Sequence, residues 1–115
     1  SVAGPPVDQL TGKGKAFVEE FGATVGGADK VQVYSAYAAQ AAEVLLDAIA
    51  ASDGTRQSVV DNIFKTNVTD GIMGSFGLDA NGDTTAGGVT MYQIKGDKQV
   101  TVKVVTPDAS LVGKG

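Results

Sequence analysis

The sequence predicts a mixed α/β chain in which three helices precede an antiparallel segment of three strands. Up to about residue 64, apolar residues recur at steps of three and four, which is the period of a helix with one buried face. After Asp70 the period changes to two, which is typical of a strand. The 115 residues are enough for one domain with one hydrophobic core.

The first helix is expected to follow Thr11, whose hydroxyl is suited to a helix N-cap. Gly22, and then the pair Gly26–Gly27, are expected to end it, because glycine is common where a helix stops. Its apolar face consists of Ala16, Phe17 and Phe21.

The second helix has the strongest periodicity and lies in VYSAYAAQAAEVLLDAIAAS, residues 33–52. Its many alanines predict that another element packs closely against it, and Gly54 is expected to end it. The polar face is expected to consist of Gln40, Glu43 and Asp47. The apolar stripe is expected to consist of Tyr34, Tyr37, Ala38, Ala41, Val44, Leu45, Ala48 and Ile49.

The third helix is short, with Thr55 as its N-cap and Asn67 marking its end. Its buried side is expected to contain Val59, Val60, Ile63 and Phe64.

Three strands are predicted after this helix, at Ser75–Leu78, Val89–Ile94 and Val100–Val105. The last two are joined by Lys95–Lys98, KGDK, a hairpin turn with a glycine available for a positive φ. In the last strand, strict alternation places the valines on one face and Thr101 and Lys103 on the other. These valines are Val100, Val102 and Val104.

Composition excludes several classes of function. The net charge of −4 and the absence of a basic run argue against binding to nucleic acid. The chain has no histidine and no cysteine, so a Ser-His-Asp or Cys-His mechanism is not available within it. Glu19 and Glu20 point about 100° apart on a helix and do not converge on one substrate. We therefore expect no catalytic residues, no cofactor and no enzyme activity.

The stretch LDANGD, Leu78–Asp83, resembles the start of a calcium loop because oxygen-bearing side chains alternate in it. An EF-hand beginning at Asp79 requires glycine at its sixth position and glutamate at its twelfth, and both positions hold threonine here. The favoured interpretation is a tight turn in which Asp79 and Asn81 bond to backbone N–H groups and Gly82 is left-handed.

The order of these motifs resembles the C-terminal third of periplasmic binding proteins of the branched-chain amino acid type. These are the extracellular ligand-binding receptors of ABC importers, with the type I periplasmic fold. The resemblance covers nearly the whole chain. It rests on the tyrosine-led helix Tyr37–Ile49, the Gly-x-x-Gly strand entry at Gly71 and Gly74, the turn Leu78–Asp83, and the hairpin glycine Gly96. In this family the LDANGD stretch is a structural turn.

The resemblance implies that the chain is part of a longer protein with two lobes joined by a hinge. Residues 1–30 would be the end of a second-lobe segment, and residues 31–115 would contain the hinge crossing and the C-terminal part of the first lobe with its closing strands. Such proteins bind an amino acid or a similar small molecule between the lobes and present it to an ABC permease. The implied location is periplasmic or otherwise outside the bacterial cytoplasm.

The resemblance also suggests two ligand-binding residues. In branched-chain amino acid binders, an aromatic residue five positions before the helix tyrosine covers the ligand side chain. Gln32 stands at that position here, and Tyr34 is the nearest aromatic residue. The change puts a purely aliphatic ligand in doubt. The groups that hold the ligand carboxylate and ammonium would lie before Ser1.

Two other functions remain open at this stage. One is a self-contained α+β interaction or structural domain, and the other is a ligand sensor with the same fold that transports nothing. A lobe that lacks neighbouring strands would expose apolar faces and edges. For this reason we also expect the isolated chain to pair with another copy or another chain.

Overall fold

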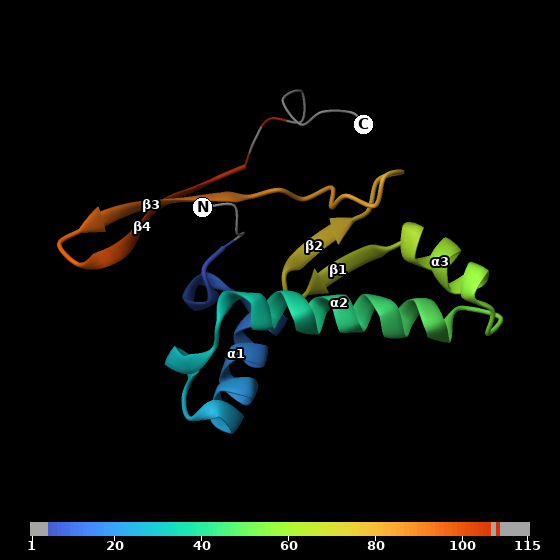
Figure 1. Ribbon diagram of the computed structural model, residues 1–115, viewed down its shortest axis with the longest axis horizontal. Coiled ribbons are helices and arrows are strands. Elements are labelled where there is room, and N and C mark those ends of the chain that lie inside the picture. The colour runs from blue at the N-terminus through green and yellow to red at the C-terminus, as the bar shows by residue number, and fades with distance from the viewer. Residues whose placement is uncertain (1–4, 107, 109–115) are drawn as a thin grey trace. The chain divides into compact units, whose positions relative to one another are not determined.

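The computed structural model describes residues 5–106 and residue 108. Contacts divide the chain into two compact units, Val7–Ala86 in one and Ser1–Pro6 with Gly87–Gly115 in the other. The first unit contains the 3-10 helices η1 (Val7–Gln9) and η2 (Ala28–Lys30), the helices α1 (Gly12–Val25), α2 (Val33–Ala50) and α3 (Arg56–Phe64), and the strands β1 (Asn67–Gly71) and β2 (Gly74–Gly77) (Figure 1). The second unit contains the strands β3 (Val89–Lys95) and β4 (Lys98–Val105).

The α/β class and the order of three helices followed by antiparallel strands are confirmed. The strands differ from expectation in number, because they form two separate hairpins, β1–β2 and β3–β4. The additional strand β1 begins at Asn67, which the sequence suggested as the end of a helix. Its residues, NVTDG, carry one large apolar side chain and so give no alternating pattern.

Helix α1 begins where the sequence predicts and ends at the second of the two glycine positions expected to end it. Thr11 is the extended N-cap residue, although its side chain makes no capping hydrogen bond. The helix continues through Gly22 and ends at Gly26, whose φ of 94° is left-handed. Gly22 has a packing role instead, because a Cβ there would lie 2.8 Å from the Cα of Ala28. Glycine at this position lets the segment after α1 fold back against the helix.

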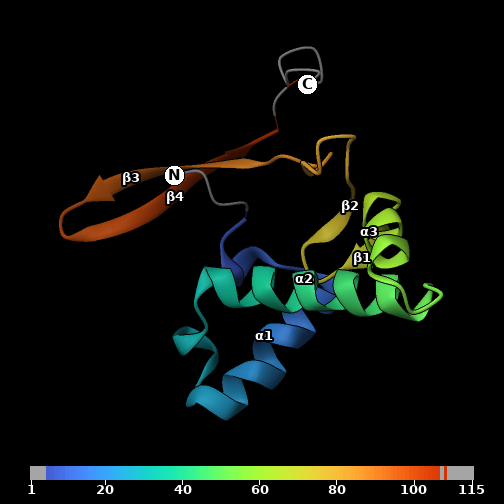
Figure 2. The ribbon, with the colours of Figure 1, turned by 45° about the vertical axis from the view of Figure 1, so that its right-hand side comes forward.

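The hydrophobic core of the first unit lies where α1, the start of α2 and the β1–β2 turn meet. Figures 1 and 2 both show α1 beside the N-terminal half of α2. The rings of Phe17 and Phe21 stack with centroids 5.4 Å apart at the edge of this core. The buried core residues are Leu10, Val18, Val31, Ala36 and Ile72.

Helix α2 packs on this core through a different face from the one expected. Its buried residues are Ala36, Gln40 and Ala48, which recur at multiples of four. Leu45 and Ile49, expected to be buried, are 46% and 48% exposed. The prediction of the buried stripe was therefore wrong for much of its length, and Gln40, expected on the polar face, is only 4% exposed. Periodicity locates an apolar surface but does not identify what that surface contacts.

The β1–β2 hairpin is short and irregular, with a register shift between Val68 and Gly71. Asp70 lies at the shift and has a φ of 51°, an uncommon value for a residue other than glycine. Gly71 is buried beside α2, and a Cβ there would collide with Oε1 of Gln40. The absence of a side chain at Gly71 therefore allows the hairpin to approach α2 closely.

The β3–β4 hairpin forms as predicted, with its turn at Gly96, whose φ is 62°. Its faces differ from prediction because of a β-bulge. Met91 pairs with Lys103 and Tyr92 with Thr101, which leaves Val102 without a partner in the register. Paired residues share a face, so the bulge reverses the alternation between Val100 and Val104. The three valines therefore do not share one face, contrary to the expectation from strict alternation.

Candidate functional site

The two residues suggested as ligand contacts lie at the start of α2. Gln32 is the N-cap residue of α2, has extended backbone angles and is exposed. Its neighbour Val31 is 5% exposed and belongs to the core, which fixes the chain at this point. Tyr34 lies in the first helical turn and is 68% exposed. Both side chains are therefore at the surface, on an anchored helix end.

Tyr34 has an aromatic neighbour on the next turn of the same helix. The ring centroids of Tyr34 and Tyr37 are 6.0 Å apart with an angle of 47° between the planes. This distance and tilt are favourable for an aromatic pair. Tyr37 is half-buried and is the less exposed ring of the pair. The arrangement presents a phenol ring that another apolar or aromatic group can cover.

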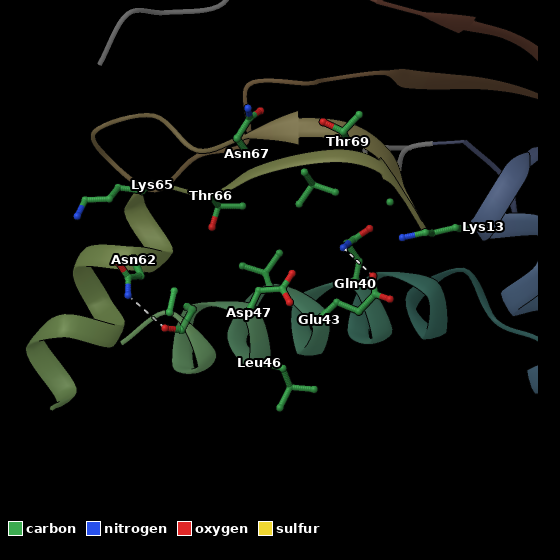
Figure 3. Close-up of a pocket in the computed structure, with 15 residues that line it drawn as sticks. Lys13, Gln40, Glu43, Leu46, Asp47, Asn62, Lys65, Thr66, Asn67 and Thr69 are labelled. Atoms are coloured by element: carbon green, nitrogen blue, oxygen red, sulfur yellow. Dashed lines mark hydrogen bonds between the residues drawn. The ribbon is translucent and has the colours of Figure 1, made fainter. Parts of the chain in front are cut away.

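A second region, which the sequence did not predict, is an open hollow bordered by α2, α3 and β1 (Figure 3). Its volume is about 560 Å³, which is in the range of small-molecule pockets. Apolar groups of α2 and β1 form part of its wall, among them Val44, Ala48 and Val68. The polar groups in its lining include Lys13, Gln40, Glu43, Asp47, Asn62 and Lys65.

Two hydrogen bonds order the polar groups of the hollow. Nε2 of Gln40 donates to Oε2 of Glu43 at 3.2 Å, and Nδ2 of Asn62 donates to the carbonyl oxygen of Ala48 at 3.3 Å (Figure 3). Glu43 and Asp47 are one helical turn apart, so their carboxylates line the same side of α2. Glu43 and Asp47 were expected on the polar face of this helix, and that polar row was the only indication of the hollow in the sequence.

Lysines border the hollow at its two ends. Lys13 comes from α1 and Lys65 follows α3, and Figure 3 shows the Lys13 side chain pointing toward Gln40. In the described part of the chain the ion pairs join Lys15 to Glu19 and Lys30 to Asp29, and neither pair borders the hollow. The hollow thus presents both signs of charge to solvent. The hollow is partly open to solvent and less enclosed than a typical ligand cleft.

The turn interpretation of LDANGD is confirmed for Asp79 and Gly82, whereas the Asn81 side chain does not make the backbone hydrogen bond expected of it. Oδ1 of Asp79 accepts hydrogen bonds from the backbone N–H groups of Asn81 and Asp83, each at 2.9 Å. Gly82 has a φ of 86°, as expected for a left-handed residue. The carboxylate of Asp79 is therefore directed at the backbone of its own loop. Within residues 5–106 and 108, no group of three or more acidic side chains is arranged to hold a metal ion.

No helix in the described part of the chain has the length and apolar character needed to cross a bilayer. The longest, α2, has 18 residues and contains Glu43 and Asp47.

A comparison with solved structures found a similar protein, the leucine-binding protein LivK from Thermotoga maritima. The two structures align with a TM-score of 0.65 and 27% sequence identity, over 92% of this chain and 32% of LivK. The chain therefore spans about a third of the length of that protein. No protein-family model and no curated protein sequence matches the chain. The chain has the fold of part of a type I periplasmic binding protein, and the resemblance to periplasmic binding proteins of the branched-chain amino acid type that its motifs suggested is confirmed.

Proposed function

We propose that this chain is part of the solute-binding component of an ABC importer, and that the whole protein binds an amino acid or a related small molecule outside the bacterial cytoplasm. The observation that carries the proposal is the structural similarity to a leucine-binding protein over 92% of the chain. The order of the sequence motifs supports the same family independently. A binding role, without catalysis, also agrees with a chain that has no histidine and no cysteine.

In this proposal the ligand lies between two lobes, and their closure around it is the signal that the permease recognises. Residues 1–30 belong to the second lobe, and residues 31–115 contain the crossing and the last part of the first lobe. Most of the groups that hold the ligand then lie outside these 115 residues. Gln32 and Tyr34 are the contribution of this chain to the cleft, because both are exposed at the anchored start of α2.

The experiment begins with the length of the reading frame that encodes this chain and the intact mass of its product. A product about three times as long is expected, and it would then be screened by thermal shift and calorimetry against amino acids, leucine, glutamine and phenylalanine among them, and against small carboxylates. A ligand at 100 times its Kd stabilises a folded protein by about 2.7 kcal/mol. A reading frame limited to these residues, or a long product that binds none of the amino acids and related small carboxylates, would refute the proposal.

Substitutions of Tyr34 in the longer protein encoded by the full reading frame test whether this residue contacts the ligand. Tyr34→Ala is expected to weaken ligand binding about tenfold, which corresponds to about 1.4 kcal/mol, because the ring covers part of the ligand. Tyr34→Phe keeps the ring and is expected to bind within about threefold of the parent. A Tyr34→Ala protein with unchanged affinity would remove Tyr34 from the site and leave the binding function itself standing.

A further inference from the structure

The chain has three asparagines, and they differ in the residue that follows each of them. Asn62 and Asn67 are each followed by a β-branched residue, whereas Asn81 is followed by Gly82. The backbone nitrogen of the next residue can attack the side-chain amide carbon of an asparagine, and a branched side chain on that residue hinders the approach. Glycine has no Cβ, so the backbone nitrogen of Gly82 is the least hindered of the three.

The structure separates Asn81 from the other two asparagines as well. Asn62 lies in α3, where its Nδ2 donates to the carbonyl oxygen of Ala48, and Asn67 begins strand β1. Both therefore lie in regular secondary structure, which restricts their backbone angles. Asn81 lies in a loop, and both it and Gly82 are exposed. Within the described residues the side-chain amide of Asn81 makes no hydrogen bond, so it is free to turn toward the nitrogen of Gly82.

We infer that Asn81 is a site of spontaneous deamidation in this protein. The backbone nitrogen of Gly82 attacks Cγ of Asn81, so that a new C–N bond forms and the bond from Cγ to Nδ2 breaks. The side-chain nitrogen leaves as ammonia with the proton that the Gly82 nitrogen gives up, and a succinimide ring is closed. Water then opens the ring at either carbonyl group and leaves aspartate or isoaspartate at this position. The reaction needs only water, and the inference is independent of the proposed function.

Hydrogen bonds of the loop restrain this reaction. The N–H of Gly82 donates to the carbonyl oxygen of Asp79 at 3.1 Å, and this bond must break before the nitrogen can attack. Oδ1 of Asp79 also accepts from the N–H groups of Asn81 and Asp83, each at 2.9 Å, which holds the loop closed on both sides of the reacting groups. Asp79 is therefore expected to slow the deamidation as well as to stabilise the turn.

Both products alter the loop. Each places a carboxylate between those of Asp79 and Asp83, and like charges at alternate positions of a tight loop repel one another. Isoaspartate also carries the main chain through the former side chain and so lengthens it, which shifts the N–H of Asp83 away from Oδ1 of Asp79. The modification therefore weakens the same hydrogen bonds that restrain it.

The test uses the folded product of the full reading frame, incubated in mildly alkaline buffer and then digested briefly with trypsin. Residues 66–95 form one tryptic peptide, because no lysine or arginine lies between Lys65 and Lys95. This peptide contains both Asn67 and Asn81, so Asn67 is an internal control. Tandem mass spectrometry locates the mass increase that results when an amide NH₂ is exchanged for OH. Asn81 is expected to convert at least about tenfold faster than Asn67.

Conversion of Asn81 no faster than that of Asn67 would overturn the inference. Variants of the loop test the restraint by Asp79. Asp79→Ala is expected to accelerate the conversion of Asn81 at least about threefold, because the loop loses the bonds that hold it closed. Asp83→Ala is the matched control, since it removes a carboxylate but keeps both bonds to Asp79, and its rate is expected to stay within about twofold of the parent. Equal rates in Asp79→Ala and Asp83→Ala would overturn the restraining role of Asp79.

Discussion

Oε1 of Gln40 accepts a hydrogen bond from the backbone N–H of Met73 at 3.2 Å, across 33 positions of the sequence. The bond joins the middle of α2 to the turn between β1 and β2. Gln40 is 4% exposed, and its amide nitrogen is bonded to Glu43. A buried polar side chain thus fixes the hairpin on the helix and supplies a partner that water cannot easily replace.

Gln40→Ala is expected to destabilise the chain by about 1–3 kcal/mol, because the N–H of Met73 loses its partner in a place with little access to water. Gln57→Ala is the matched control, since Gln57 is exposed and bonds only to Asp61 one turn away. The control is expected to change the free energy of unfolding by less than about 0.5 kcal/mol. Urea unfolding, monitored by circular dichroism, measures the free energy of unfolding of both variants. Equal losses of stability in Gln40→Ala and Gln57→Ala would mean that the Gln40–Met73 hydrogen bond makes no specific contribution to the stability of the fold.

Gly14→Ala is expected to destabilise the chain by about 1–3 kcal/mol, although alanine is the better helix former by about 1 kcal/mol. A Cβ at Gly14 would collide with the carbonyl oxygen of Ile72, a backbone atom that cannot turn aside. Gly87→Ala is the control, because a Cβ there meets nothing within 4 Å and the φ of Gly87 is not positive. Thermal unfolding measures the stability of Gly14→Ala, Gly87→Ala and the parent chain. A more stable Gly14→Ala protein would show that α1 and the hairpin do not make this close approach.

Asp79→Ala is expected to lower stability by about 1–2 kcal/mol, because two backbone N–H groups lose their acceptor. Asp83→Ala removes a second carboxylate from the same loop while keeping the backbone bond from Asp79 N–H to Asp83 carbonyl oxygen, so its effect is expected to be smaller. Millimolar calcium is expected to leave the Tm of the parent chain unchanged. A calcium-dependent rise in Tm that is abolished by Asp79→Ala would show that this loop is a metal site and would contradict its interpretation as a structural turn.

The pKa of Asp53 is expected to be lower than its ordinary value of 3.8. The main cause is the Thr55 hydroxyl, which donates to Oδ1 of Asp53 at 2.7 Å, followed by the Thr55 backbone N–H at 2.9 Å. The ionised form is therefore favoured in the folded chain. Its contribution to stability is complete above the unfolded pKa of about 3.8 and is lost as the pH falls through the lower folded pKa.

NMR titration of the carboxyl carbon of Asp53 measures the pKa of this residue in the folded chain directly. The prediction is a midpoint below 3.8 in the folded chain and a weaker loss of stability below that pH in Asp53→Asn. A midpoint at or above 3.8 would contradict it. The same bonds matter to α3, because the Thr55 hydroxyl also accepts from the N–H of Ser58 as the N-cap of that helix.

The sequence predicted those elements whose signals are local. The existence of helix α2, the N-cap at Thr55 and the hairpin glycine at Gly96 each depend on a few neighbouring residues, and each is confirmed. Strand β1 depends on its partner β2, since its residues have no alternating apolar pattern of their own. It could be recognised only once the pairing of Val68 with Phe76 was known.

The contacts of α2 were beyond sequence reasoning for a related reason. Gln40 was assigned to the polar face because glutamine is usually exposed, and its role became visible only with the position of Met73. The hollow beside Glu43 and Asp47 depends on how α3 and β1 lie against α2, which no local pattern encodes. Gln32 and Tyr34 were reached through family resemblance, and their roles in binding stay a prediction.

The bulge at Val102 also bears on how this hairpin can vary among related proteins. Every other residue from Val100 to Val105 has a partner on β3, so removing Val102 would leave each of those pairs intact. Only the local twist of the ribbon would change. This is a position where natural sequences can gain or lose one residue without moving any neighbour to the opposite face. Alignments of relatives across this strand should therefore place their single-residue gaps here.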